Sequence, residues 1–90
     1  MAAHSGTVSA QLLALLRCPE TMQPLSLASP EQLALVEATR AAGSLRDRAG
    51  KPVTELISEG LIRADGRLLF PVRDGIPILL LDEAVPLGEG

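Results

Sequence analysis

The chain has 90 residues, 47% of them hydrophobic and 21% charged, and a net charge of -3, which excludes two independent cores and an extended disordered chain. It has no Trp or Tyr and one Phe, so aromatic platforms for nucleic-acid bases are excluded, and the acidic balance disfavours phosphate binding. Because it has one cysteine, no apolar run of membrane-spanning length and no positive charge in its first ten residues, we expect a cytoplasmic protein without nucleic-acid or membrane partners.

A short helix is predicted from residue 9 to residue 17. Leucines recur there at spacings of three and four, Ser9 is a suitable N-cap, and Pro19 stops the pattern. Residues 1–8 before this helix are expected to be a disordered tail. Residues 19–24 after it include two prolines and are predicted to form a turn.

A second helix is predicted from residue 30 to residue 42. Ser29 and Gln32 form a capping box at its start, and Gly43 ends it. Apolar residues at helical spacing form a stripe that is expected to pack against a sheet: Ala34, Ala38, Ala41 and Leu45, with Leu33 and Val36 alongside. The polar residues 44–51 are predicted to form a solvated loop.

The second half of the chain is typical of an antiparallel meander. Short runs rich in β-forming residues are separated by turn residues and cover 53–57, 61–64, 67–72 and 76–81. Asp65-Gly66 and Asp74-Gly75 are typical of tight hairpin turns, because both pairs accept the positive φ that such turns need. The sequence therefore predicts a small sheet of three to four strands.

The last predicted strand is apolar on both faces. Side chains alternate in direction along a strand, and both sets here are apolar, Ile76, Ile78 and Leu80 on one face and Pro77, Leu79 and Leu81 on the other. Pro77 donates no hydrogen bond to a ladder, which places this strand at a sheet edge. An apolar edge requires a cover. The chain's own helices, a second copy of the chain and a different protein are all candidates for that cover.

Three stretches resemble one known family. The run LLRCPETMQPL at 15–25 is similar to the opening zinc knuckle, C-P-x-C-x-x-P-L, of the small activator subunits of methyltransferases and of their short bacterial relatives. The run LIRAD at 61–65 resembles the second knuckle of that family, and FPVRDGIPILL at 70–80 is similar to its segment Y/F-P-[IV]-R-D-G-I-P-[VI]-[ML]-L. The resemblance covers 12–25 and 61–87, and residues 26–60 between them are a helical insert.

The resemblance implies a zinc-ribbon-like fold, but the knuckle positions lack zinc donors. Cys18 is present, whereas Thr21 and Arg63 stand where the family has cysteines. A structural zinc site needs four N, S or O donors, and a guanidinium is not one of them, so no metal and no cofactor are expected. The prediction is a single metal-free α+β domain at 9–87, with both helices packed on one face of the meander, and a tail at 88–90.

The sequence contains no paired acid and base, no nucleophile beside a base and no phosphate-binding loop, so we expect no enzyme activity. The resemblance implies a non-catalytic protein-binding module that activates or stabilises an S-adenosylmethionine-dependent methyltransferase acting on translation components. The residues expected to bind the partner, among which Phe70 and Ile78 are equally candidates for the core, are Phe70, Pro71, Ile76, Pro77, Ile78 and Leu79. The alternative is a self-associating structural domain, a homodimer with no methyltransferase partner.

Overall fold

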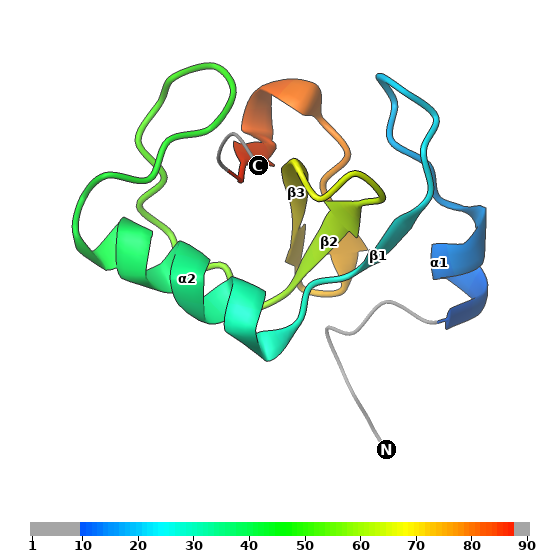
Figure 1. Ribbon diagram of the computed structural model, residues 1–90, viewed down its shortest axis with the longest axis horizontal. Helices are drawn as coiled ribbons and strands as arrows, with labels where there is room; N and C mark the ends of the chain where they lie inside the picture. The colour runs from blue at the N-terminus through cyan, green and yellow to red at the C-terminus, as the bar shows by residue number, and fades with distance from the viewer. Residues whose placement is uncertain (1–9, 88–90) are drawn as a thin grey trace.

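The computed structural model describes residues 10–87, so the two expected tails and the predicted N-cap at Ser9 lie outside the described residues. The elements of this range (Figure 1) follow one another in the order α1 (Ala10–Leu15), β1 (Leu25–Leu27), α2 (Pro30–Ala41), β2 (Gly60–Arg63), β3 (Leu68–Arg73), β4 (Ile76–Pro77), the short 3-10 helix η1 (Leu81–Glu83) and β5 (Val85–Pro86). The predicted α+β class is confirmed.

The strands form one antiparallel sheet in the order β1-β2-β3-β4, and β5 also pairs with β3. Leu25 of β1 pairs with Arg63 of β2, and Leu61 of β2 pairs with Phe70 of β3. On the other side of β3, β4 pairs with its last two residues and β5 with its first two. The predicted strands at 61–64 and 67–72 are confirmed as β2 and β3, each shifted by one residue.

The edge of the sheet beyond β3 differs from the prediction. The hairpin at Asp74-Gly75 is confirmed, with φ of 53° and 77° at its two residues, which is the positive pair that a tight hairpin needs. The strand predicted at 76–81 is wrong beyond Pro77. Ile78 donates its N–H to the carbonyl of Pro71 at 2.9 Å, and the chain then leaves the sheet through η1 and returns as β5.

Two further strand predictions were wrong. Residues 53–57 form no strand. Directly before them, Arg46 and Pro52 form an isolated antiparallel β-bridge. Conversely, β1 begins directly after Pro24, inside the region predicted as turn and insert. Pro24 is tolerated there because it only has to accept a hydrogen bond, and Ala64 donates its N–H to the Pro24 carbonyl at 3.0 Å.

The two helices pack on opposite faces of the sheet, which corrects the prediction that they share one face. On the knuckle face, Leu13 of α1 and Leu16 directly after it pack against a buried cluster that consists of Cys18, Leu25, Leu61, Leu68, Phe70, Val72 and Ala84. On the insert face, α2 and the loop after it contribute to a cluster that consists of Val36, Leu45, Ile57, Ile62, Leu69 and Val85. Figure 1 shows α1 and α2 far apart with the strands between them. Both faces of β2 and β3 are apolar, so both need a cover.

Helix α2 begins as the sequence predicts but contacts the sheet through different side chains. The capping box is present, because Gln32 donates its N–H to Ser29 Oγ at 3.1 Å and Ser29 donates its N–H to Gln32 Oε1 at 2.8 Å. Val36 is buried and Leu33 half-buried, whereas the alanines of the predicted stripe, Ala34, Ala38 and Ala41, are exposed. The larger aliphatic side chains bury more area per contact and therefore decide which side of α2 faces the sheet.

Candidate functional site

The residues at the zinc-knuckle positions come together at one end of the sheet, on its knuckle face. The turn after α1 closes through two backbone bonds, from Cys18 N–H to the Gln23 carbonyl at 2.9 Å and from Met22 N–H to the Cys18 carbonyl at 2.8 Å. This turn holds Cys18, which is fully buried, with its Sγ 3.7 Å from the guanidinium nitrogen Nη1 of Arg63. The sequence interpretation of Cys18 as a buried small side chain after the first helix is confirmed.

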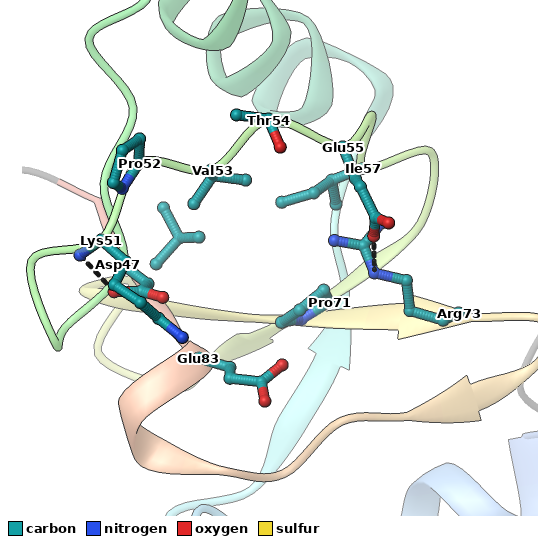
Figure 2. Close-up of a pocket in the computed structure, with 11 residues that line it drawn as sticks. Asp47, Lys51, Pro52, Val53, Thr54, Glu55, Ile57, Pro71, Arg73 and Glu83 are labelled. Carbon is teal, nitrogen blue, oxygen red and sulfur yellow. Dashed lines mark hydrogen bonds and ion pairs between the residues drawn. The ribbon is translucent and has the colours of Figure 1, made fainter.

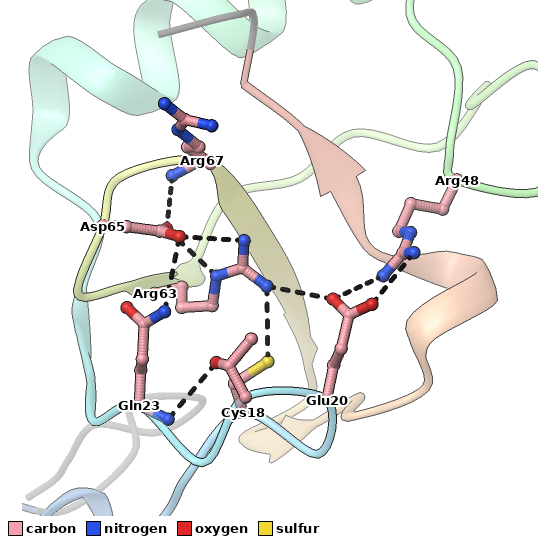
Figure 3. Close-up of polar contacts among 8 residues, drawn as sticks. Cys18, Glu20, Gln23, Arg48, Arg63, Asp65 and Arg67 are labelled. Carbon is pink, nitrogen blue, oxygen red and sulfur yellow. Dashed lines mark hydrogen bonds and ion pairs between the residues drawn. The ribbon is translucent and has the colours of Figure 1, made fainter.

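Arg63 connects the knuckle turn to the β2–β3 hairpin (Figure 3). Its side chain is only 11% exposed, and its nitrogens lie 2.9 Å from Asp65 Oδ2 and 3.1 Å from Glu20 Oε1. Glu20 is held in turn by both terminal nitrogens of Arg48, at 2.9 and 3.2 Å. The Arg63 guanidinium therefore joins two chain segments at the place where the family resemblance puts a metal, through directed hydrogen bonds of fixed geometry, and Glu20 extends the network to the segment of Arg48.

The charges in this network alter the protonation of its members. Burial by itself raises the pKa of the Cys18 thiol, but hydrogen bonds from Thr21, Arg63 and nearby backbone N–H groups outweigh it, so the pKa is lowered overall. The Arg63 guanidinium, helped by the backbone N–H of Arg67, lowers the pKa of Asp65 from 3.8 to about 2. The pKa of Glu20 is lowered by its hydrogen bonds from Arg48. At neutral pH the carboxylates of the network are therefore ionised.

This cluster does not fit a metal site or a nucleophile. Within residues 10–87 no group of three His, Cys, Asp or Glu side chains is arranged to hold a metal ion. The guanidinium of Arg63 occupies the centre of the knuckle and has no lone pair to give to a cation. Cys18 is buried and has no imidazole base beside it within the described residues, because His4, the one histidine of the chain, lies outside them. The residues at the knuckle positions therefore do not fit a zinc ion.

The six residues predicted to bind a partner divide into two groups. Phe70 is 0% exposed and Pro71 is buried as well, so neither side chain lies on the exposed edge. Ile76 is 62% exposed, whereas Pro77, Ile78 and Leu79 are half-buried. The burial of Phe70 follows from its place in the middle of β3, between β2 and the outer strands, which local sequence alone does not reveal.

Sequence reasoning missed one exposed side chain at this edge. Leu80 is 57% exposed, because the chain has left the sheet there and both of its neighbours, Leu79 and Leu81, pack against the knuckle-face cluster. We define the partner edge as the exposed side chains of Ile76 and Leu80 together with the half-buried Pro77, Ile78 and Leu79. The unbroken apolar run from Ile76 to Leu81 indicated that one side of the segment alone cannot bury all of its side chains.

A cleft of about 380 Å³ lies beside this edge, on the insert face (Figure 2). Its apolar lining comes from Val53, Ile57, Pro71 and Val85. Arg73 stands at one end of the cleft, where it donates to the Leu56 carbonyl at 2.8 Å and lies 3.6 Å from Glu55. This cleft was not predicted from the sequence, because a strand at 53–57 would have continued the sheet at this place.

None of the helices in the described range has the length and apolar character to cross a membrane. The class of protein that these features define is a small α+β domain in which a knuckle is closed by an arginine network and one sheet edge carries exposed aliphatic side chains.

Comparison with known proteins gives the family. No protein-family model matches the sequence. The fold is similar to the solution NMR structure of XF2673 from Xylella fastidiosa, with a TM-score of 0.71 and 33% identity, over 88% of this chain and 81% of that chain. The chain therefore belongs to the same family as XF2673. Its homologues are UPF0434 proteins, among them one of Ehrlichia chaffeensis that is 54% identical over 39 residues, which are 43% of this chain and 61% of that protein.

One relative is much larger than this chain. It is a protein of Verminephrobacter eiseniae named tetraacyldisaccharide 4'-kinase, 44% identical over 72 residues, which are 79% of this chain but 14% of the relative. The chain thus spans 14% of the length of the Verminephrobacter eiseniae protein and 61% of the length of the Ehrlichia chaffeensis protein.

Proposed function

We propose that the protein is a non-catalytic protein-binding module and that the partner edge is its binding surface. The observation that carries the proposal is the exposure of Ile76 and Leu80, at 62% and 57%, in a segment whose other residues are already half-buried by the chain itself. Burial of apolar surface contributes about 25 cal/mol per Å². A partner that covers these side chains therefore gains free energy from a surface that is already ordered by β3.

The lack of a reactive constellation supports a binding role. Among the described residues, the ionised groups of the knuckle are engaged with one another rather than directed into a cleft. Arg73, which stands at one end of the cleft, is held by Glu55 and the Leu56 carbonyl. General acid or base catalysis needs such groups within reach of a substrate.

The partner edge favours docking through side chains over the addition of a strand. Strand addition requires free N–H and C=O groups along an edge. β4 has only two residues, Ile76–Pro77, and its proline has no N–H to donate. We therefore propose that the partner covers Ile76 and Leu80 with an apolar surface of its own.

The first candidate partner is an S-adenosylmethionine-dependent methyltransferase that acts on translation components. It follows from the resemblance of the segment FPVRDGIPILL, which forms β3, the hairpin turn and β4. In this proposal the module contacts neither S-adenosylmethionine nor the substrate. It binds the folded enzyme and stabilises it, by about 2.7 kcal/mol when the module is present at one hundred times its Kd.

A second candidate partner is a tetraacyldisaccharide 4'-kinase. The observation that favours it is the 44% identity of this chain to a segment of the Verminephrobacter eiseniae protein of that name. Because the matched segment makes up 14% of that relative, a domain of this kind is covalently joined there to a much longer polypeptide. A separate module of the same family is then a candidate to bind the corresponding enzyme non-covalently.

The test is a capture experiment with matched variants. The double variant Ile76→Ser, Leu80→Ser alters the partner edge, and Leu35→Ser, which replaces a leucine that is 70% exposed on α2, is the control. The wild-type chain and the control are expected to capture a methyltransferase or the kinase from the native host, identified by mass spectrometry, and the double variant is expected to lose it. Circular dichroism checks that all three chains are folded.

Two outcomes would contradict the proposal. If the double variant captures the same enzyme as the wild type, the partner edge is not the binding surface. If light scattering instead finds a wild-type dimer that does not depend on concentration and that the double variant loses, the edge is covered by a second copy, and the self-associating alternative is correct.

A further inference from the structure

An open depression adjoins the partner edge at η1. It has a volume of about 500 Å³, and apolar and charged residues both line it, namely Pro19, Leu79, Leu80 and Leu81 together with Lys51, Asp82 and Glu83. This volume is within the usual range of ligand and side-chain pockets. The depression and the cleft of Figure 2 share Lys51 and Glu83, so they are neighbouring parts of one hollowed surface.

The rim of this depression carries an excess of negative charge. Asp82 and Glu83 are exposed, and neither forms an ion pair with a cation of residues 10–87. Asp74 adds a third exposed carboxylate in the turn before β4. Lys51 is the cation that lines the depression. Asp74 therefore precedes the apolar segment in the chain, and Asp82 and Glu83 follow it and line the depression together with Lys51.

We infer that this depression receives an apolar side chain of a partner protein whose neighbouring residues are Arg or Lys. The inference rests on the proposed function and specifies the chemistry of the partner's surface. Leu79, Leu80 and Leu81 supply the apolar contact, while Asp82 and Glu83 attract the flanking cations of the partner. Complementary charge at the rim of an interface acts mainly on the association rate and on the choice of partner.

The same charges disfavour a second copy as the occupant. A two-fold axis through this surface brings the same residues of two chains together. Where such an axis passes close to η1, Asp82 and Glu83 face the same two residues of the other copy, and Lys51 is the cation of each depression that balances them. Like charges in such a position repel, and the repulsion weakens as salt screens it.

A pair of short synthetic peptides tests the inference even while the natural partner is unidentified. Both contain the pair Leu-Leu, flanked by arginines in one peptide and by glutamates in the other. Binding to the uniformly labelled full chain is followed by NMR chemical shifts at low salt. The arginine peptide is expected to shift the amides of Leu79 to Leu81 and to bind at least about tenfold more tightly than the glutamate peptide.

Two variants complete the experiment. In D82N/E83Q the ratio of the two affinities is expected to fall to about one, whereas E31Q, which neutralises an exposed acid in the first turn of α2, is expected to leave the ratio unchanged. Equal binding of both peptides to the wild type, or no binding of either, would overturn the inference. These results are independent of the capture experiment, so the inference can fail while Ile76 and Leu80 still bind an enzyme. A dimer that forms at high salt and buries Leu80 would also overturn it.

Discussion

Both faces of one sheet bury an apolar cluster, and the knuckle face adds to its cluster a network of charged hydrogen bonds around Arg63. On the knuckle face, Arg63 joins Cys18, Glu20 and Asp65 through charge-assisted hydrogen bonds. On the insert face, aliphatic side chains of α2 and its following loop pack on Leu69. On the knuckle face the guanidinium of Arg63 links the turn around Cys18 to the β2–β3 hairpin, and on the insert face the capped helix α2 covers the sheet.

The difference also has a consequence for how each face responds to solution conditions. Directed bonds between charged groups depend on protonation and, where exposed, on salt. Burial of aliphatic side chains is non-directional and depends neither on protonation nor on the screening of charges by salt. Four changes test this comparison and are given in order of decreasing predicted loss of stability.

Leu69→Ala is expected to have the largest effect, on the insert face. Leu69 is fully buried, and Gly60 lies so close that an added Cβ there would be 2.9 Å from Leu69 Cδ2. The surroundings are therefore filled, and the substitution leaves a cavity that lowers the free energy of unfolding by about 3 kcal/mol. Urea denaturation measures the loss, which is expected to be the same at low and high salt. Leu35→Ala, on the exposed side of α2, is the control.

Arg63→Met tests the knuckle face. It removes the donor shared by Cys18, Glu20 and Asp65, and we expect a loss of about 1 to 2 kcal/mol in the free energy of unfolding, typical of hydrogen bonds to charged groups. Arg63→Lys keeps the charge but not the planar fork, so it is expected to recover only part of the loss. Denaturation in urea at two salt concentrations measures both variants. Full stability of Arg63→Met would show that the network is dispensable and that the comparison is wrong.

Ser29→Ala tests whether the insert face depends on the capping of α2. The substitution removes the acceptor for the N–H of Gln32, 3.1 Å away, and is expected to lower stability by about 1 kcal/mol. Hydrogen exchange is expected to become faster in the first turn of α2 and to stay unchanged in the turn around Cys18. Faster exchange in both places would mean that the two faces unfold as one unit.

Acidification is expected to give the smallest effect and to act on the knuckle face. The pKa of Asp65 is lowered from 3.8 to about 2 in the folded chain, so its contribution to stability is complete above the unfolded value and is lost as the pH falls from 3.8 to about 2. The difference in stability between the wild type and Asp65→Asn, followed by thermal denaturation, is expected to shrink over this window. A constant difference would contradict the network as drawn in Figure 3.

Local sequence signals predicted several elements correctly. The capping box of Ser29 and Gln32 and the hairpin turn at Asp74-Gly75 were found because each depends on residues within a few positions of one another. The strands β2 and β3 were found because buried strands are rich in β-branched and other apolar residues. Cys18, Thr21 and Arg63 were grouped through the family resemblance, and in the structure both Thr21 and Arg63 hydrogen-bond to Cys18.

Other features were decided by contacts between distant residues. The excursion after Ile78 is held by the loop at 47–50, where Arg48 donates its N–H to the Ala84 carbonyl at 2.9 Å and Ala49 to the Asp82 carbonyl at 3.2 Å. The same loop sends the Arg48 side chain to Glu20. No pattern within either segment indicates these contacts, so the strand predicted at 76–81 was too long and the role of Glu20 was not foreseen.

By itself, the sequence of this protein determined its α+β class, its two helices, the central hairpin and the absence of zinc donors at two knuckle positions. These properties depend on the conformational preferences and chemistry of individual residues and their near neighbours. Tertiary structure alone decided that the helices cover opposite faces, that Phe70 is interior while Leu80 is exposed, and that Arg63 takes a central place among the knuckle side chains. Each of those outcomes depends on which apolar surfaces, from segments distant in the sequence, pack together and exclude water. That packing is determined only when the whole chain folds.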